Sequence, residues 1–303
     1  MSPSDPVLEV GPWAEDKLAR LRKYLSAFTA IMRKRHWAEG YVYVDAFAGS
    51  GQVRLRKVET DPSPAIFDLG SEFTRDPNAQ ELLDGSPRVA LEITNPFTHY
   101  VFLERDAKRA ALLRAIKEEF KGRRNIVIRT GDCNEYLSEK LVNNPVIDWR
   151  RWRGVVFLDP FGMQVPWSTL SHLAETRALE VFLNFPVGMS IQRLLKRDGQ
   201  FTEKERRKLD QYFGDEGWFD VIYPRKRDLF GLERSKVEDA EQRLVAWYRE
   251  RLRKKFGFVS EPHLVVNSRG GHLYFLVFAG PNPTGARIAN YVLQAGKVVR
   301  QRA

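Results

Sequence analysis

The chain of 303 residues contains a single cysteine, Cys133. One thiol cannot form a disulfide within the chain, and it cannot supply the several cysteine ligands of a zinc or iron–sulfur site. None of the five histidines stands four residues from another, which is the spacing of a metal-binding pair on a helix. The sequence therefore predicts no structural metal.

Long apolar runs are missing as well. No apolar stretch reaches the roughly 18 to 20 residues that span a bilayer. Prolines and carboxylates interrupt the first residues of the chain, unlike the apolar core of a signal peptide. These two absences favour a cytoplasmic protein. The 43% share of hydrophobic residues is ordinary for a globular protein, so a folded core is expected.

Positive charge is in excess, with a formal net charge of +10. Such a charge favours an acidic partner such as a nucleic acid. Short basic runs, among them Arg206–Lys208 and Arg225–Arg227, concentrate between positions 196 and 255. Short runs are equally typical of solvated helix faces, so the charge indicates nucleic-acid binding without establishing it.

Strand and helix patterns alternate through the middle of the chain. The predicted strands are 41–47, 99–104, 125–129, 154–159 and 179–185. The predicted helices between them are 65–73, 107–120, 134–141 and 167–175. Strands that are apolar on both faces and are followed by helices predict a doubly wound parallel sheet covered on both sides. The ligand of such a sheet binds at the carboxyl ends of its strands.

Three further segments complete the predicted domain organisation. Residues 1–40 form an N-terminal helical extension, because Trp13 to Arg35 has the apolar spacing of a long amphipathic helix. Residues 41–303 form a Rossmann-like domain, in which the charged and aromatic segment 199–235 is an insertion for target or partner binding. Two β-type runs around the turn Ser268–Gly271 predict a hairpin that closes the sheet with an antiparallel strand.

Candidate site residues follow the ends of successive predicted strands. The first strand ends in Asp45–Gly51 (DAFAGSG), whose glycines allow the backbone to turn tightly and to approach a ligand. The second ends in Glu104, at the place where a carboxylate accepts hydrogen bonds from ribose hydroxyls. A surface glutamate that caps the next helix is the alternative interpretation.

The later strand ends add acceptors and an aromatic ring. Asp132, after the third strand, either accepts from an adenine amino group or caps the next helix. The fourth strand ends in Asp159–Gly162 (DPFG), which offers a carboxylate and the Phe161 ring to a planar, amine-bearing group. Asn184, at the end of the fifth strand, either orients a substrate or forms the turn before Pro186.

In this order, these motifs are similar to the motif series of class I methyltransferases, particularly those that act on nucleic-acid bases. The resemblance implies a seven-stranded, mostly parallel Rossmann-like sheet that binds S-adenosylmethionine. The methionine end of this cofactor is expected at Asp45, Phe47, Gly49 and Gly51, the ribose at Glu104, and the adenine at Asp132 and Cys133.

A narrower resemblance is to the three-Cys-motif partner protein family. The segments that carry it are Lys23–Leu25, Tyr43–Gly51, Phe157–Gly162 and Leu183–Arg193. Members of that family resemble methyltransferases and are associated with a cysteine-motif, radical-SAM-like protein. The resemblance therefore implies a partner of that kind.

The function predicted from these residues is methyl transfer from S-adenosylmethionine to a nitrogen or oxygen of a nucleic acid. Asp159 would be the acceptor or base, Phe161 the stacking face and Asn184 a second polar contact. The DPFG motif departs from the Asp/Asn-Pro-Pro-aromatic motif of base amino-methyltransferases, because Phe161 replaces the second proline. The alternative is therefore a cofactor-binding subunit that delivers substrate to the partner. A dinucleotide-dependent dehydrogenase is disfavoured, since the first turn lacks a full G-x-G-x-x-G fingerprint.

Overall fold

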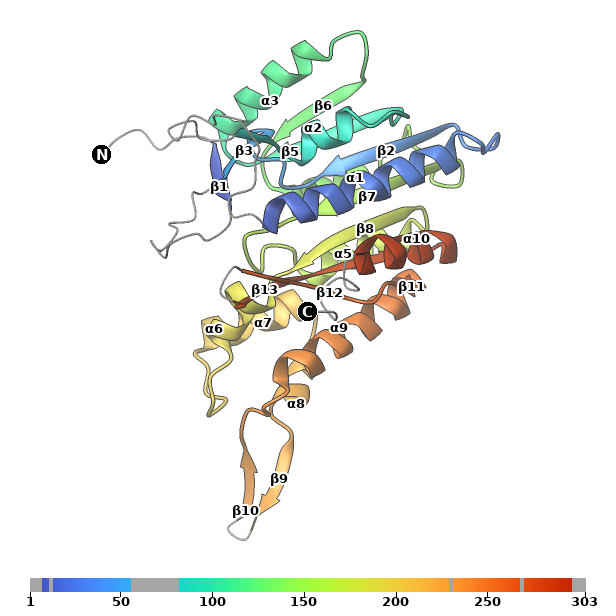
Figure 1. Ribbon diagram of the computed structural model, residues 1–303. Helices are drawn as coiled ribbons and strands as arrows, with labels where there is room; N and C mark the ends of the chain where they lie inside the picture. Colours follow the sequence, from blue (N-terminus) through green and yellow to red (C-terminus); the bar gives the residue numbers. More distant parts are fainter. Residues whose placement is uncertain (1–6, 11–12, 56–81, 229–230, 268–269, 296–303) are drawn as a thin grey trace, which may run out of the picture.

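The computed structural model describes residues 7–10, 13–55, 82–228, 231–267 and 270–295. Across these residues, a central eight-stranded sheet is covered by helices on both faces (Figure 1). The helix predicted at 65–73 lies outside the described residues.

Five strands of the central sheet run parallel. They are β2 (Gly40–Asp45), β5 (His99–Glu104), β6 (Ile126–Thr130), β7 (Trp152–Leu158) and β8 (Leu179–Phe185). Their order across the sheet is β6-β5-β2-β7-β8, so the chain builds outwards from β2 in one direction and then in the other. The carboxyl end of β2, between β5 and β7, is the switch point at which such sheets bind ligands.

Three antiparallel strands close the sheet. Strand β13 (His272–Gly280) pairs with β8, and β11 (Phe258–Val259) and β12 (His263–Val266) both pair with β13. Val259 lies opposite Ala279 and His263 opposite Leu276, so β11 and β12 occupy one interrupted strand position. The eight strands thus fill seven positions. This arrangement confirms the predicted Rossmann-like fold of the class I methyltransferase type and its closing hairpin.

One face of the sheet is covered by α1, α2, α3 and α10. These helices span Trp13–Met32, Ser86–Leu91, Ala107–Glu119 and Pro283–Gln294. Helix α1 lies between α2 and α10 and buries Leu21, Tyr24, Leu25 and Phe28 in a core shared with the sheet (Figure 1). The predicted amphipathic helix is therefore present, although it ends three residues before Arg35.

The other face is covered by helices of the second half of the chain together with α4. They are α4 (Cys133–Glu135), which continues as the π-helical turn η1 (Tyr136–Leu141), then α5 (Trp167–Glu175), α7 (Glu203–Phe213) and α9 (Ala240–Phe256). After β8, a π-helical turn, η2 (Val187–Ile191), leads into the short helix α6 (Gln192–Leu194). This second core contains a group of aromatic rings in contact with one another, among them Phe185, Tyr212 and Tyr248.

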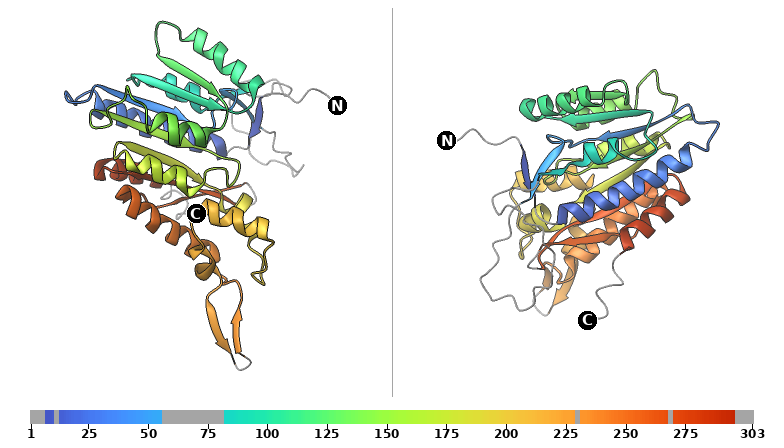
Figure 2. Two further views of the ribbon diagram at one scale, coloured as in Figure 1. Left: turned by 180° about the vertical axis from the view of Figure 1, so that it is seen from behind. Right: turned by 45° about the horizontal axis from the view of Figure 1, so that its top comes forward.

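The segment 199–235 contains more than helices. Helix α7 begins at a capping box formed by Thr202 and Glu205, and α8 spans Gly217–Ile222. A two-stranded antiparallel hairpin follows, formed by β9 (Arg225–Asp228) and β10 (Gly231–Arg234). This hairpin, hereafter the arm, extends away from the body of the molecule (Figure 1 and the left view of Figure 2).

A small second sheet lies beside the first turn of the main one. It consists of β1 (Leu8–Val10), β3 (Gln52–Leu55) and β4 (Leu82–Asp84), with β3 in the middle. The sequence patterns did not predict these short strands. Among the described residues, no helix has the length and apolarity needed to cross a membrane.

Candidate cofactor and substrate site

The loop after β2 is held by hydrogen bonds to both neighbouring strands. The amide of Ala46 donates to the Phe157 carbonyl at 3.0 Å, and the amide of Ala48 donates to the Leu103 carbonyl at 3.0 Å. Gly49 and Gly51 then adopt positive φ angles of 61° and 78°, a region that glycine enters without steric cost. The DAFAGSG motif therefore makes the tight turn at the switch point that the sequence predicted.

A cavity of 340 Å³ opens at the carboxyl ends of β2, β5 and β6. It is hereafter called the strand-end cavity. Six predicted site residues line it, namely Phe47, Gly49, Glu104, Asp132, Cys133 and Phe161. Arg109 and Gln164 also line it and were not predicted. The fold thus brings residues from four separate loops to one hollow.

Glu104 is buried at the floor of the strand-end cavity. Its Oε1 atom accepts from the Asp106 amide at 2.8 Å and pairs with the Arg109 guanidinium at 3.0 Å. All of its hydrogen bonds to the described residues converge on Oε1. The carboxylate is therefore fixed in orientation, and Oε2 is left to accept from a ligand.

Asp132 and Cys133 lie at the start of α4. The Asp132 carboxylate accepts from the amides of Asn134 at 2.7 Å and Glu135 at 3.4 Å, so it caps the helix. Asp132 therefore both caps α4 and lines the strand-end cavity. Burial raises the pKa of the Cys133 thiol to about 12, which keeps it protonated at neutral pH. Cys133 is therefore an apolar wall residue without thiolate reactivity.

Asp45 and Gly51 lie behind the cavity wall. Asp45 is fully buried and accepts from the Phe47 amide at 3.2 Å and the Tyr43 hydroxyl at 3.2 Å. Burial raises the pKa of its carboxyl to about 7, with a smaller contribution from the nearby Asp159 charge. A Cβ atom on Gly51 would lie 2.3 Å from the Ile116 side chain, so Gly51 allows α3 to pack closely. Both residues support the loop from within.

Asp159 and Asn184 meet on the face of the sheet that carries α1. The Asn184 amide nitrogen donates to Asp159 Oδ1 at 2.7 Å, as expected for neighbouring strand ends. Asp159 Oδ2 pairs with Lys17 of α1 at 2.5 Å. The amide oxygen of Asn184 is buried and has no hydrogen-bond partner among the described residues. This Asp159–Asn184–Lys17 group is hereafter the acceptor cluster.

Lys17 is the member of this cluster that the sequence did not predict. Its ammonium group also lies 5.5 Å from the centre of the Tyr274 ring, on the closing strand β13. In the sequence, Lys17 is one cation among many on an amphipathic helix. Only the packing of α1 across the strand ends distinguishes it.

Phe161 follows Asp159 by two residues and lines the strand-end cavity. The residue is 64% exposed, and its amide donates to Gln164 Oε1 at 3.0 Å. One residue further, a Cβ atom on Gly162 would lie 2.8 Å from Ser190 Oγ. The DPFG loop therefore packs against the segment that follows Asn184, and it exposes an aromatic ring to solvent.

Sequence comparisons identify no relative, since no protein-family model and no curated protein matches the chain. A solved structure does resemble it. Protein LPL1258 from Legionella pneumophila str. Philadelphia 1 aligns over 91% of each chain with a TM-score of 0.50 and 11% identity. The fold is shared. At this identity, the likeness says nothing about ligand or reaction.

Two methyltransferase structures align more weakly. Trm1 from Pyrococcus horikoshii, with S-adenosyl-L-methionine, has a TM-score of 0.37 and 12% identity over 97% of this chain and 61% of that chain. The O-methyltransferase from Bacillus cereus, in complex with SAH, has a TM-score of 0.38 and 12% identity over 92% of this chain and 93% of that chain.

Proposed function

We propose that the protein is an S-adenosylmethionine-dependent methyltransferase that acts on a nucleic acid in the cytoplasm. The observation that carries this proposal is the strand-end cavity, where Glu104 offers an unbonded carboxylate oxygen and Phe161 follows Asp159 of the acceptor cluster by two residues. The cavity supplies a place for the cofactor, and the acceptor cluster supplies a place for the group to be methylated.

The cavity residues fit the cofactor in size and chemistry. Its volume of 340 Å³ falls within the range of roughly 300 to 1,000 Å³ that is usual for small-molecule sites. Glu104 Oε2 would accept from the ribose hydroxyls, and the wall of Asp132 and Cys133 would hold the adenine. Phe47 and Gly49 would border the methionine end. Asp45 and Gly51 would act indirectly, by fixing the loop that carries these two residues.

The cofactor supplies a methyl group that its sulfonium already makes electrophilic. The protein must therefore hold a nucleophile in line with that methyl group, and it must accept the proton that the nucleophile loses. Asp159 is placed to accept a hydrogen bond or proton from an N–H or O–H group. The partnerless oxygen of Asn184 is placed to accept a second hydrogen, as an exocyclic amine would require. Phe161 offers a stacking face for a base.

The surface charge supports a nucleic acid as the target, with the arm as its contact. The sequence of the arm contains Arg225, Arg227 and Arg234, and the hairpin register sets position 225 opposite position 234. A groove of about 870 Å³ beside α5 and α7 is less suitable for phosphates. Its charged lining residues are four carboxylates and two arginines, namely Glu203, Asp210, Asp215, Glu216, Arg206 and Arg207.

A transfer assay tests the proposal. The purified protein is incubated with S-adenosylmethionine labelled in the methyl group and with DNA, tRNA, ribosomal RNA or protein as acceptor. We expect label in one nucleic acid, at least a hundredfold less label with Asp159→Asn, and unchanged cofactor binding by that variant. Asp148→Asn, at a surface turn, is the matched control. Label in protein alone, or in no acceptor, would contradict the proposed target or activity.

A second candidate function is favoured by the ion pair of Lys17 with Asp159. This pair occupies the carboxylate that catalysis needs, and the DPFG motif departs from the usual base-methylating sequence. The protein would then be a cofactor-binding subunit that delivers substrate to a cysteine-motif, radical-SAM-like partner, as the sequence resemblance implies. In that case Asp159→Asn would leave substrate delivery intact, whereas deletion of the arm or disruption of α1 would abolish it.

A further inference from the structure

A second cavity lies at the opposite edge of the sheet from the strand-end cavity. It has a volume of 160 Å³ and is enclosed by α1, the start of α10, and the amino ends of β7 and β8. It shares no lining residue with the strand-end cavity. It is hereafter called the amino-edge cavity.

A buried carboxyl group lines the amino-edge cavity. Glu180, at the start of β8, is 6% exposed, and its Oε2 atom accepts from the Tyr24 hydroxyl at 2.6 Å. No described residue donates to Oε1, and the absence of a side chain at Gly285 leaves room for this oxygen, since a Cβ atom there would lie 2.4 Å from it. Oε1 can therefore accept a hydrogen bond from a ligand.

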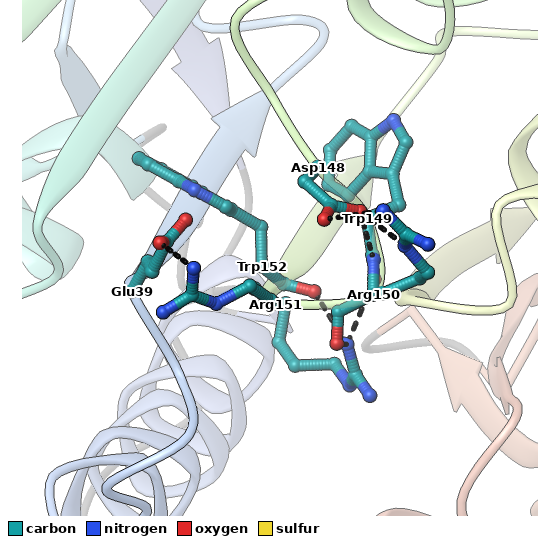
Figure 3. A network of polar contacts seen from close by, with 7 residues as sticks. Glu39, Asp148, Trp149, Arg150, Arg151 and Trp152 are labelled. Carbon is teal, nitrogen blue, oxygen red and sulfur yellow. Dashed lines mark hydrogen bonds and ion pairs between the residues drawn. The ribbon is translucent and has the colours of Figure 1, made fainter.

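A guanidinium group also lines the cavity. Three arginines surround Trp152 at the start of β7, and two of them pair with carboxylates, Arg150 with Asp148 and Arg151 with Glu39 (Figure 3). The third, Arg153, pairs with no carboxylate among the described residues. Its Nη1 atom donates to backbone carbonyls, including that of Trp149 at 2.9 Å, while Nε and Nη2 make no hydrogen bond to described residues.

The position of Arg153 is fixed by an aromatic ring. Its guanidinium carbon lies 4.4 Å from the centre of the Trp37 ring, which is a stacking geometry that holds a cation in place. Arg35, exposed just beyond the last turn of α1, also lines the cavity and adds positive charge. The cavity lining therefore combines a hydrogen-bond acceptor with donors that carry positive charge.

The lining also includes apolar side chains, among them Phe28, Met32 and Ile288. The volume is close to that of an engineered cavity of about 150 Å³ that binds benzene. The space therefore admits one ring or a branched aliphatic group and excludes a nucleotide.

We propose that the amino-edge cavity binds a free apolar α-amino acid, with its amino group at Glu180 and its carboxylate at Arg153. An ammonium group supplies the donor that Glu180 Oε1 lacks, and a carboxylate accepts from the unbonded nitrogens of Arg153. An amine alone would face the positive charge of Arg153 without compensation, and a carboxylate alone would face Glu180. A zwitterion offers a donor to Glu180 and an acceptor to Arg153.

Calorimetric titration of the full chain tests this proposal. The probes are valine, leucine, methionine and phenylalanine, together with two half-ligands, isoamylamine and isovalerate. We expect one of the amino acids to bind at least tenfold more tightly than either half-ligand. Glu180→Gln should weaken that binding at least tenfold, and Glu175→Gln, an exposed carboxylate at the end of α5, should leave it unchanged.

A second variant keeps the test independent of the charge of Glu180. Ile288→Phe enlarges an apolar wall and should abolish amino-acid binding by filling the cavity, while its circular dichroism spectrum and its binding of S-adenosylmethionine remain those of the unaltered protein. The proposal is overturned if no amino acid binds, if a half-ligand binds as tightly as its amino acid, or if both variants bind as the unaltered protein does.

Discussion

Two glycines with nearly equal φ angles allow steric overlap to be separated from backbone strain. Gly51 and Gly122 have φ angles of 78° and 75°, but only Gly51 has a neighbour within reach of an added Cβ atom, Ile116 at 2.3 Å. Left-handed geometry alone costs a side chain roughly 1 to 2 kcal/mol, and overpacking a core adds typically about 1 to 3 kcal/mol. Gly51→Ala should therefore lower the free energy of unfolding by about 2 to 5 kcal/mol, and Gly122→Ala by about 1 to 2 kcal/mol. Urea unfolding measures both, and equal losses would contradict the packing of Gly51 against α3.

The buried carboxyl of Glu180 predicts a pH dependence of stability. Burial raises its pKa to about 7 in the folded protein, whereas an unfolded glutamate ionises near about 4.3. Between these values, the unfolded chain releases a proton that the folded chain keeps, so the free energy of unfolding falls as pH rises through this window. The loss amounts to roughly 3 kcal/mol above pH 7.

Glu180→Gln removes this pH dependence, because glutamine does not ionise, and it retains an acceptor for the Tyr24 hydroxyl. We compare how far the free energy of unfolding falls between pH 4.5 and pH 8 in each protein. This fall should be about 3 kcal/mol smaller in the variant than in the unaltered protein. Asp45, whose carboxyl pKa burial also raises, is present in both proteins and cancels from the difference. Urea unfolding at the two pH values provides the measurement. Parallel losses in the two proteins would show that Glu180 ionises normally in the fold.

At the scale of single residues, the sequence located the candidate site better than it described each role. Phe47, Glu104 and Phe161 follow the ends of three predicted strands. They were expected at one cavity because the carboxyl ends of parallel strands share an edge. The sequence could not distinguish a residue that lines the cavity from one that supports the loop, as Asp45 does. Nor could it find Lys17, since an ion pair across 142 positions is set by how α1 packs.

At the scale of elements, the arm is the segment most separable from the body. Its first and last residues, Arg225 and Arg234, are paired across the hairpin, so a short glycine-serine linker can replace residues 225–234 without opening the chain. We expect this deletion to leave cofactor binding unchanged and to weaken nucleic-acid binding at least tenfold. The slope of log affinity against log salt should fall by about 0.9 for each duplex phosphate that the arm no longer neutralises.

Filter binding at several salt concentrations measures this slope. A variant with Arg225, Arg227 and Arg234 changed to glutamine keeps the hairpin and should reproduce the weaker binding. Lys254→Gln, at the exposed end of α9, is the control for a general change in charge. Unchanged affinity in the deletion would place the nucleic acid elsewhere on the surface, whereas weakened cofactor binding would show that the arm supports the fold.

Elements with strong periodicity were predicted, and short or polar ones were missed. Strands β5 and β8 and helix α5 have the predicted bounds, because long apolar runs between helices allow few alternatives. The arm was not predicted as a hairpin, since the sequences of its strands are charged and show no alternation of apolar and polar residues. Helix α10 was also missed, although it begins with the N-cap Asn282 and a proline in its first turn.

At the scale of the whole molecule, one helix contacts both edges of the sheet. Helix α1 places Lys17 at the carboxyl edge, against Asp159, and Tyr24 at the amino edge, against Glu180. We propose that S-adenosylmethionine binds at the carboxyl edge, in the strand-end cavity. The fold class could be predicted from sequence because the alternation of strands and helices determines it, whereas the amino-edge cavity depends on how α1 and α10 pack together.

The most direct test of that claim is calorimetric titration of the purified protein with S-adenosylmethionine, S-adenosylhomocysteine and NAD. We predict that the first two bind, that NAD does not, and that binding of both is lost in Gly49→Val and Glu104→Ala. Glu118→Ala, an exposed carboxylate on α3, should bind like the unaltered protein. Absence of binding by both adenosyl ligands, or binding that survives in Gly49→Val and Glu104→Ala, would contradict the assignment of the strand-end cavity.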